Sequence, residues 1–518
     1  MKKHLFWILP AIVIIIGICL IFNRSIDDVT EQPEEDWSRS LKIGTTTVDK
    51  KLPVRENEDG NVVTQTYEEN MVRFKTFNDN FELIDETPFD IPFDKWTQVF
   101  LHDDQLIYHD YRDICDQDGN VIIPDAKRFY PLDHTVLYIK ENSLYELDPA
   151  DHSSAKIMEL EEGIEDIIPF QEEQTRYFMT ETSRNNNIEL NVYELADKDA
   201  ELVHEEKFQI DAMQTVDDIN FAVHDGNLAY VMETVQKQTQ GSPESYTYFT
   251  EKPLGSDQET SLQQMTFHDP VGKGLLSEAS NITLSYQDGS PQLLFSAGGS
   301  TKTLYQGDQA FNIYSATITD SGSIQTSRKS NTPKVSGHPQ WIDESTVMWL
   351  EREGDTTNIY VSSSNPAIID KAAGLAKDDW LHALGKTLGM LAKVLITLLV
   401  STIWLMWPIS FIVLMYLIQG RKLDEDQTWF FYAGIAIYML AVFIFKDIIF
   451  IDAMFARAPD YLTFTGSSYI YILAFAVMAF IAAQSTKTTR DWHAPARICC
   501  FAGAHVLMLL SFFGPYYF

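Results

Sequence analysis

The densest group of side chains that could carry out chemistry lies between residues 102 and 113. Its members are histidines and carboxylates, which are common zinc ligands: His102, Asp103, Asp104, His109, Asp110 and Asp113. His109 and Asp110 stand in a run typical of a strand, which directs successive side chains to opposite faces. No second pair of ligands complements them, so the pattern favours a polar strand edge over a zinc site.

A second candidate is the segment 116–120 (DQDGN), which is followed by Asp125. Alternating carboxylates of this kind can converge on a calcium ion, which prefers oxygen ligands. Ile114 occupies the place of the first ligand, and its side chain offers no oxygen. We therefore interpret the segment as a plain turn, and the sequence assigns no metal ligand.

The common motifs of catalysis are missing from the sequence. It contains no Gly-x-Ser-x-Gly, His-Glu-x-x-His, Cys-x-x-Cys or Gly-x-x-x-x-Gly-Lys pattern. The segment 298–302 (GGSTK) looks like part of a phosphate loop, but it stands between strand-like runs and does not precede a helix. A hairpin loop is the better interpretation. The sequence assigns no catalytic residue and no cofactor, and it favours binding over catalysis.

Charge is concentrated in the middle of the chain. Residues 23–385 contain 28 Lys/Arg and 67 Asp/Glu, a net charge of −39. Such a surface repels phosphates, which argues against nucleic-acid binding. Cys115 is the only cysteine in this region, so no intrachain disulfide can form there. A large exported domain without disulfides indicates a bacterial envelope.

Both ends of the chain are apolar enough to enter a bilayer. The uncharged run 5–22 follows Lys2 and Lys3, is long enough to cross as a helix, and precedes no cleavage site, so a retained anchor is expected. Four further membrane helices are predicted at 394–418, 429–450, 464–483 and 497–514.

The loops between these helices predict their orientation. Positive charge gathers in 419–428, which contains Arg421 and Lys422, and in 484–496, whereas 451–463 has one arginine and two aspartates. Base-rich short loops stay in the cytoplasm. The N-terminus is therefore expected in the cytoplasm, and residues 23–385 and the C-terminus are expected outside a cell membrane that the chain crosses five times.

Three polar side chains within the predicted spans could mark a conduction path: Lys446, Asp447 and His505. Lys446 lies near the outer end of its helix, where its ammonium can reach the headgroups beside Asp447. His505 is a single group nearer mid-span, and a neutral imidazole hydrogen-bonded to a neighbouring helix accounts for it. We expect these helices to act as a scaffold.

The middle region repeats a turn. Asp-Gly-Asn followed by apolar residues occurs at 59–61, 118–120 and 225–227, with variants at 288–290 and 320–322. Asp-Gly pairs suit hairpin turns, in which positive φ angles are required. Short β-prone runs flank these turns. The pattern predicts an all-β sandwich, barrel or propeller.

The segment 335–361 distinguishes among these folds. It contains Pro-x-Trp-x-x-Asp, an apolar strand, and then Gly-x-x-x-Asn-Ile-Tyr. This pattern resembles the repeat of TolB-type or WD-like β-propellers. The matching residues are Pro339, Trp341, Asp343, Val347, Trp349, Gly354, Asn358, Ile359 and Tyr360. The resemblance implies that the tryptophans pack between neighbouring sheets and that the aspartate caps a hairpin turn. It implies no activity.

The propeller region is about 325 residues long, which at about 45 residues per blade predicts seven blades, with six or eight as alternatives. The expected fold class is a membrane protein with an all-β extracytoplasmic propeller. The predicted parts are an N-terminal transmembrane anchor at 1–22, a polar tether at 23–40, the propeller at 41–365, a juxtamembrane helical linker at 366–393 and four transmembrane helices at 394–518.

This organisation favours a membrane-anchored extracytoplasmic binding module, acting as a sensor or an assembly partner in a bacterial envelope. Propellers bind on the face around their central channel, so a protein or an envelope polymer is the expected partner there, in addition to the lipid bilayer around the helices. The alternative is an enzyme or transport component with a site between the propeller face and the transmembrane block.

Overall fold

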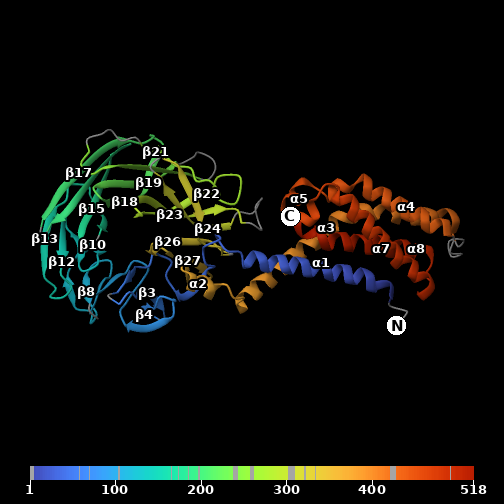
Figure 1. Ribbon diagram of the computed structural model, residues 1–518, viewed down its shortest axis with the longest axis horizontal. Helices are drawn as coiled ribbons and strands as arrows, with labels where there is room; N and C mark the ends of the chain where they lie inside the picture. Colours follow the sequence, from blue (N-terminus) through green and yellow to red (C-terminus); the bar gives the residue numbers. More distant parts are fainter. Residues whose placement is uncertain are drawn as a thin grey trace. The chain divides into compact units, whose positions relative to one another are not determined.

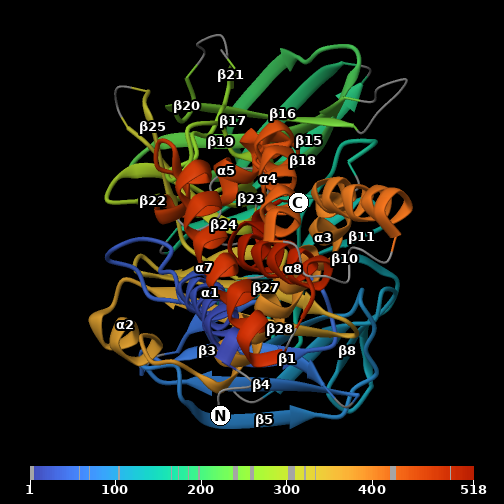
Figure 2. The same ribbon diagram turned by 90° about the vertical axis from the view of Figure 1, so that its right-hand side faces the viewer.

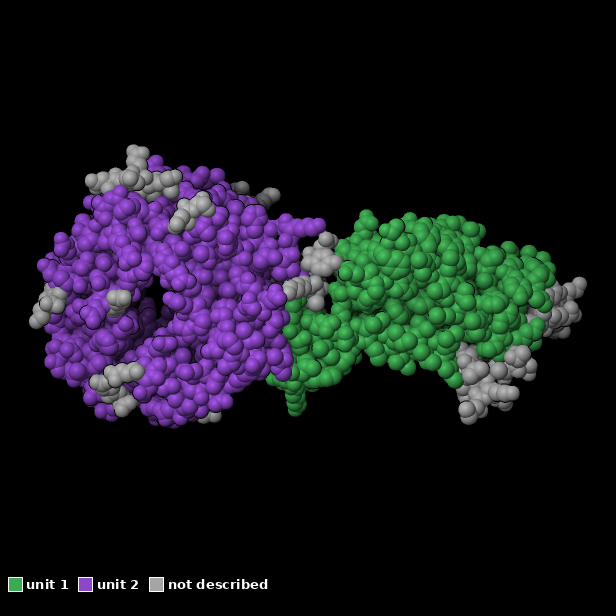
Figure 3. Space-filling view, viewed as in Figure 1, with its two compact units in different colours: residues 1–31, 302–308, 375–518 green, residues 32–301, 309–374 purple. Residues whose placement is uncertain are grey.

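The computed structural model divides into two compact units (Figure 1). The propeller unit comprises residues 32–301 and 309–374, and the helical unit comprises residues 1–31, 302–308 and 375–518 (Figure 3). The structure describes residues 5–57, 59–68, 70–102, 105–164, 166–172, 174–184, 186–196, 199–236, 243–256, 262–301, 310–319, 322–332, 334–420, 428–490 and 492–517. Several residues used in the predictions lie outside these ranges: Lys2, Lys3, Asp103, Asp104, Lys302, Asp320, Ser321, Arg421 and Lys422.

The described strands of the propeller unit form seven four-stranded antiparallel sheets, here called blades. Blade 1 contains β2 (Val54–Glu56), β3 (Val62–Glu68), β4 (Met71–Phe77) and β5 (Leu83–Phe89). Blade 2 contains β6 (Gln98–His102), β7 (Gln105–His109), β8 (Ile114–Asp116) and β9 (Val121–Ile123). Blade 3 contains β10 (Ala126–Pro131), β11 (Val136–Lys140), β12 (Ser143–Leu147) and β13 (Ser154–Glu159).

Most strands of the next blades are longer. Blade 4 contains β14 (Ile168–Glu172), β15 (Thr175–Arg184), β16 (Asn187–Ala196) and β17 (Asp199–Gln209). Blade 5 contains β18 (Gln214–His224), β19 (Asn227–Gln236), β20 (Glu244–Pro253) and β21 (Gln263–Gln264). Blade 6 contains β22 (Ser277–Gln287), β23 (Ser290–Gly299), β24 (Ala310–Ile318) and β25 (Ile324–Arg328). Blade 7 contains β26 (Ser336–Asp343), β27 (Thr346–Glu353), β28 (Thr356–Ser363) and β1 (Leu41–Thr46).

The ring of blades is closed by its own N-terminal strand. β1 pairs antiparallel with β28, so that Leu41 lies opposite Val361, and blade 7 takes its fourth strand from the other end of the unit. This exchange covers an edge that would otherwise be open to pairing with other chains. Seven blades are confirmed, and the alternatives of six or eight are wrong.

The recurring Asp-Gly turns explain why their spacing is irregular. In blade 5 the turn joins the first and second strands, with φ of 47° at Asp225 and 75° at Gly226. In blade 2 the turn at Gly119, with φ of 83°, joins the third and fourth strands. The motif therefore marks two different hairpins of a blade, and its intervals need not equal whole blades.

The segment that resembles a propeller repeat forms most of blade 7. Trp349 is 0 % exposed and belongs to a core cluster that includes Leu294 and Ile313 of blade 6, so its predicted position between blades is confirmed. Trp341 packs against the same cluster but is only half-buried, so its predicted burial is confirmed in part. Asp343 caps the turn as predicted, because its Oδ1 accepts the backbone N–H of Ser345 at 2.6 Å.

The last part of the predicted tether is docked on the propeller. Trp37 is buried, and its indole N–H donates to the Ser362 hydroxyl at 2.8 Å. The buried Arg328 guanidinium donates to the carbonyl oxygens of Gln32 and Pro33 at 3.2 and 3.3 Å. The polar composition of this segment predicted a solvated chain, but these tertiary contacts hold it in place.

Helices make up the helical unit, and one short helix, α2 (Pro366–Ala372), follows blade 7. The helical unit contains α1 (Leu5–Val29), α3 (Lys377–Gln419), α4 (Thr428–Ile444), η3 (Lys446–Ile448), α5 (Asp452–Arg457), α6 (Asp460–Thr463), α7 (Ser467–Arg490), α8 (Ala494–Phe513) and η4 (Gly514–Tyr516). α3 is one helix of 43 residues, so the predicted linker from Lys377 onward is continuous with the second predicted span, whereas its first residues form the separate α2.

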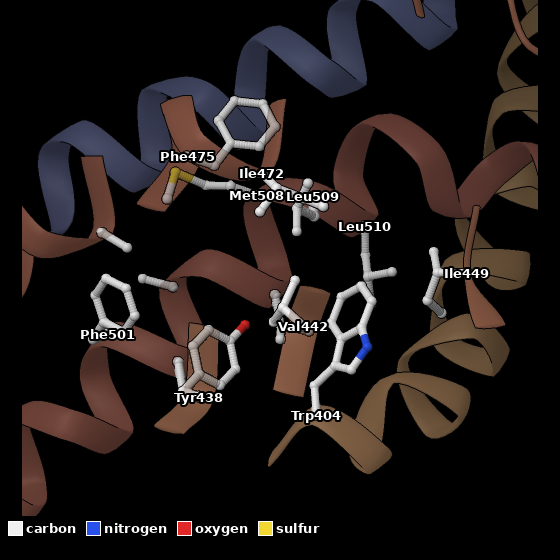
Figure 4. Packing of buried hydrophobic residues seen from close by; sticks show 14 of the residues in the cluster. Trp404, Tyr438, Val442, Ile449, Ile472, Phe475, Phe501, Met508, Leu509 and Leu510 are labelled. Atoms are coloured by element: carbon white, nitrogen blue, oxygen red, sulfur yellow. The ribbon is translucent and has the colours of Figure 1, made fainter. Parts of the chain in front are cut away.

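Four described helical segments are long and apolar enough to cross a membrane: Ile8–Val29, Lys377–Gln419, Ser467–Lys487 and Ala494–Tyr516. α4 is apolar but has 17 residues, and the helix ends at Ile444 before the predicted limit of that span. Trp404, Tyr438 and Phe501 contribute to the core of the unit, where the side chains of several helices meet (Figure 4).

Candidate functional site

The described histidines and aspartates of the group at 102–113 lie on different elements, in strands β6 and β7 and in the turn that follows β7. His109 is buried, stacks on Phe129 and has its Nε2 2.9 Å from the carbonyl oxygen of Ala126. The Asp110 carboxylate instead accepts the backbone N–H of Asp113 at 2.7 Å, within the turn that follows β7. His102 lies in β6 and stacks on Phe100 of the same strand. The described members of this group therefore do not converge on one point.

The segment that resembles a calcium loop forms the β8–β9 turn. The Asp116 carboxylate accepts the backbone N–H groups of Asp118 and Asn120 at 3.0 and 2.8 Å, and it also accepts the amide of the Asn120 side chain. Its oxygens are thus engaged in shaping the turn, as the interpretation as a plain turn predicts. Across the described ranges, no three histidine, cysteine, aspartate or glutamate residues are arranged to hold a metal.

The glycine pair before Ser300 ends strand β23. Gly299 packs against Tyr314 so closely that any larger side chain would collide with the tyrosine hydroxyl. This position lies at the connection between β23 and β24 and precedes no described helix. The described part of this segment ends β23, which pairs antiparallel with β24 as a hairpin requires, and Gly299 serves packing.

Several carboxylate side chains lie at one end of the central channel. The first strand of each blade lies innermost, since β14, β18, β22 and β26 contact one another in succession. A β-bulge at the start of β18 presents two consecutive acids, Asp217 and Asp218. Asp218 lies directly opposite Glu233 of β19, and its charge also acts on Glu181 of β15. Four carboxylates from blades 4 and 5 therefore share this end, which we call the acidic channel end.

Burial and mutual repulsion change the protonation of the acidic channel end. Burial, together with the nearby charges of Asp218 and Asp217, raises the pKa of Glu233 to about 7, although the backbone N–H of Ile282 donates to its Oε1 at 3.1 Å. Asp218 is exposed to water, but partial desolvation by the surrounding protein still raises its pKa. The charge of Lys51 acts on Asp218 and partly offsets this repulsion. The group can bind protons or attract positively charged groups.

Blades 4 and 5 are also joined by a buried ionic cluster. Glu206 of β17 receives Lys252 of β20 at 2.7 Å and has His204 at 3.4 Å, and all three side chains are nearly inaccessible to water. Burial alone would raise the pKa of Glu206, but hydrogen bonds from His204 and Lys252 lower it. Removing one member would leave a buried charge uncompensated, so this cluster fixes the contact between blades.

The sequence did not reveal the acidic channel end or the ionic cluster. Their members lie in β-prone runs, and each group combines residues of two blades that are at least 36 positions apart in the sequence, Glu181 with Asp217 and Glu206 with Lys252, so no local spacing predicts either group. The consecutive aspartates at 217 and 218 interrupt an otherwise ordinary strand, and they are the one local signal of the channel end. Only the ring of blades brings these groups together.

The helical unit contains the three polar groups considered as a conduction path. Lys446 donates to Asp447 at 2.7 Å and lies over the ring of Tyr469, as expected for a surface pair. His505 is fully buried, with its Nε2 2.9 Å from the Ile472 carbonyl oxygen and its Nδ1 2.7 Å from the Tyr438 hydroxyl. The predicted hydrogen bond to a neighbouring helix is confirmed.

A further ion pair in the helical unit was not predicted. Lys386 of α3 pairs with Asp28 of α1, and the Thr387 hydroxyl donates to the Ser25 hydroxyl at 3.1 Å. Because the sequence placed Asp28 in a tether and Lys386 in a linker, nothing suggested that they meet. Together these contacts hold α1 against α3.

The fold defines the chain as a seven-bladed β-propeller joined to apolar helices. No protein-family model and no curated protein matches the sequence. Among solved structures it is similar to the N-terminal domain of Nup159, with 10% identity, a TM-score of 0.35, and 64% of this chain and 96% of that chain covered.

Two enzymes give likenesses of the same order. For a GH93 alpha-L-arabinofuranosidase of Fusarium graminearum, solved with arabinobiose, the identity is 10%, the TM-score is 0.35, and 63% of this chain and 98% of that chain are covered. For the polysaccharide lyase Uly1 the identity is 9%, the TM-score is 0.37, and the coverage is 61% and 90%. Similarities with such low sequence identity concern the fold alone. They assign no enzymatic activity to this chain.

Proposed function

We propose that this chain is a membrane-anchored, extracytoplasmic binding module of a bacterial envelope. The observation that carries the proposal is a closed ring of seven blades that is flanked in the sequence, on both sides, by helices apolar enough to span a bilayer. Figure 3 shows that the propeller unit is hollowed where the blades of Figure 1 surround their centre. A rigid ring of this kind presents loops and channel groups to a partner.

The outward side chains of the helical unit support an insertion in lipid. Leu399 and Leu417 of α3 are 70% and 78% exposed. A water-soluble surface rarely carries such a continuous display of leucine, whereas hydrocarbon accommodates it without cost. α3 is about 65 Å long at about 1.5 Å per residue, which exceeds the bilayer core of about 30 Å.

The proposed topology has five crossings, formed by α1, α3, α4, α7 and α8. α4 has 17 residues, which is at the lower limit of about 17 residues for a spanning helix. The N-terminus then lies in the cytoplasm, and the acidic residues 23–385 and the C-terminus lie outside. The placing of Lys/Arg in alternate loops supports this orientation.

The proposed partner is a protein or an envelope polymer at the propeller face, which would make the chain a sensor or an assembly partner. The net charge of −39 over residues 23–385 supports a partner that carries positive charge, because long-range attraction speeds encounter. Crosslinking of the full chain in its native membrane, followed by mass spectrometry, tests this proposal. Crosslinks from propeller lysines to one stable partner are expected, and their absence would contradict the binding function.

The orientation has a separate test. Cys115 is buried, so a cysteine is introduced instead at Asp225, whose side chain is 88% exposed in a propeller turn. A membrane-impermeant maleimide applied to cells without an outer membrane should label Asp225→Cys and leave Lys487→Cys unlabelled. The reverse pattern would overturn the proposed topology.

A further inference from the structure

Two aromatic side chains beside blade 2 are exposed to water. Trp96, in the connection between β5 and β6, is 59% exposed, and Tyr111, in the turn between β7 and β8, is 69% exposed. No other aromatic residue in the described part of the propeller unit is as exposed, and the centroids of these two rings are 6.5 Å apart. A single exposed apolar residue is ordinary, but two that lie together indicate an interaction site. We call them the exposed aromatic pair.

Each ring is carried by a turn that an aspartate fixes. Asp94 Oδ1 accepts the backbone N–H of Trp96 at 2.7 Å, and Asp110 Oδ1 accepts the backbone N–H of Arg112 at 3.0 Å. β6 pairs antiparallel with β7, so the segment before β6 and the turn after β7 meet at one end of the blade. Blades 1 and 2, whose β5 and β8 are labelled in Figure 2, share a core cluster. The pair therefore stands on defined turns of two packed blades.

The backbone of Tyr111 adopts a conformation that tyrosine disfavours. Its φ is 81°, in the left-handed region, where a residue with a Cβ is strained and glycine is not. Glycine would form the same turn with about 1–2 kcal/mol less strain. Residues held in such conformations gather at functional sites. The aromatic ring at this position therefore has a purpose other than the stability of the turn.

Charged groups border the exposed aromatic pair. The Lys95 ammonium lies 4.7 Å from the centroid of the Trp96 ring, and the Arg112 guanidinium pairs with Asp125 at 3.3 Å. The apolar surface is thus small and is surrounded by hydrogen-bond donors and acceptors. A sugar ring matches this composition, because its C–H faces pack on aromatic rings and its hydroxyls form hydrogen bonds around the rim. An apolar segment of a protein partner would need a wider apolar surface.

The exposed aromatic pair shares a face of the ring with the acidic channel end. The charge of Lys50 acts on Asp94, and the charge of the next residue, Lys51, acts on Asp218. One connection, between β1 and β2, therefore reaches both places. Carboxylates on this face repel polymers that carry phosphate or carboxylate groups. The sugar that this face accepts is accordingly uncharged.

We propose that the exposed aromatic pair binds an uncharged sugar ring of an envelope polymer. The ring stacks on Tyr111 beside Trp96, and the charged groups around the pair form hydrogen bonds with its hydroxyls. The inference rests on the proposed binding function and specifies the ligand class and the residues that recognise it.

Saturation-transfer NMR on the full chain tests this proposal, in micelles of a detergent without a sugar headgroup. The probe is a tetramer of N-acetylglucosamine, which is uncharged, and it should bind. A hyaluronate tetramer, in which alternate rings carry a carboxylate, should bind about tenfold more weakly because of repulsion by the acidic face. Absence of binding by the uncharged tetramer, or equal binding of the two tetramers, would overturn the proposal.

Three variants locate the site. Trp96→Ala and Tyr111→Gly should each weaken binding of the uncharged tetramer about tenfold. Tyr111→Gly should keep the thermal stability of the wild type, because glycine accepts the φ of 81° without strain. Leu202→Ala, at an exposed leucine of blade 4, is the matched control and should bind as the wild type does. Unchanged binding by Tyr111→Gly would contradict the inference even if Trp96→Ala failed to fold.

A proline decamer tests a different occupant, since aromatic surfaces also bind proline-rich polypeptides. No binding of the decamer at this site is expected. Binding of the decamer in place of the tetramer, with loss in Trp96→Ala, would assign the pair to a polypeptide and overturn the sugar site.

The crosslinking experiment separates this inference from the proposed function. If the wild type crosslinks to a protein partner but does not bind the uncharged tetramer, the sugar site is wrong and the binding module stands. If the wild type binds neither, the binding function itself fails. Binding of the tetramer by the wild type, with loss in Tyr111→Gly and retention in Leu202→Ala, is the result expected from the inference.

Discussion

The propeller unit and the helical unit differ in how they divide polar and apolar side chains between surface and interior. The propeller unit carries acids on its surface and closes its interior with aromatic side chains such as Trp349. The helical unit exposes leucines such as Leu399 and buries a hydrogen-bonded histidine, His505. The comparison teaches that the two surfaces follow opposite rules, since the acidic surface of the propeller unit suits water and the exposed leucines of the helical unit fit its proposed insertion in lipid.

Buried charge is kept in two ways, and the propeller unit contains both, since its Glu206 is paired directly with Lys252. In the propeller unit Glu351 of β27 is buried, and its Oε2 has no hydrogen-bond partner among the residues described, so burial raises its pKa to about 7. In the helical unit the charged groups of Asp28 and Lys386 are paired directly. The first arrangement makes stability depend on pH, whereas the second neutralises charge locally.

The largest expected effect is the loss of the interblade core. Trp349→Ala should lower the free energy of unfolding of the propeller unit by about 3–5 kcal/mol, because it removes a fully buried aromatic side chain. Denaturant titration of the full chain in micelles measures it. Trp96→Ala, at a tryptophan that is 59% exposed, is the control and should change little. Equal effects at both positions would contradict the described core.

Introducing an arginine on the surface of each unit tests the difference between the two surfaces. Leu399→Arg should oppose membrane insertion by about 2.5–3.5 kcal/mol, because an exposed face of α3 would carry a charge into hydrocarbon. The amount of protein in the membrane fraction measures the effect. Leu202→Arg, at an exposed leucine of β17, is the control and should accumulate normally. Normal insertion of Leu399→Arg would indicate that this face does not contact lipid.

The buried carboxyl of Glu351 predicts a pH dependence of stability. Its pKa in the folded protein exceeds its ordinary value of 4.5, so the folded state holds the proton more tightly. This contribution is fully present below about pH 4.5 and is lost as the pH rises through about 7. The free energy of unfolding should fall by about 2 kcal/mol between about pH 5 and about pH 8.

Glu351→Gln should make this profile shallower, because the amide cannot ionise, while Glu233, whose pKa is also raised to about 7, retains a dependence of the same sign. Denaturant titrations at several pH values measure both proteins. A profile with the same slope in Glu351→Gln would show that other groups control the pH dependence.

The smallest expected effect concerns the buried histidine of the helical unit. His505→Leu should destabilise the helices by about 0.6–1.7 kcal/mol, because it removes the hydrogen bonds to Tyr438 and to the Ile472 carbonyl oxygen. Thermal unfolding in micelles measures the loss, and His505→Gln should recover part of it. If His505→Gln abolished crosslinking to the partner at unchanged abundance, the scaffold hypothesis would fail.

The local features of this chain follow from its sequence. Asp225 and Gly226 adopt positive φ because hairpin turns require it and these residue types tolerate it. Strand alternation already separated His109 from Asp110, and the apolar runs marked the helices. Such features depend on neighbours within a few residues, and so the pattern of residue types suffices to predict them.

Only the tertiary structure decided the features that join distant segments. Closure by β1, the pairing of Asp28 with Lys386, the acidic channel end and the ionic cluster around Glu206 each combine residues from separate segments of the chain. Trp341 shows the same limit, since its residue type predicted a buried position but the packing around Trp37 left it half-buried. Long-range packing sets which side chains meet, and no local spacing encodes it.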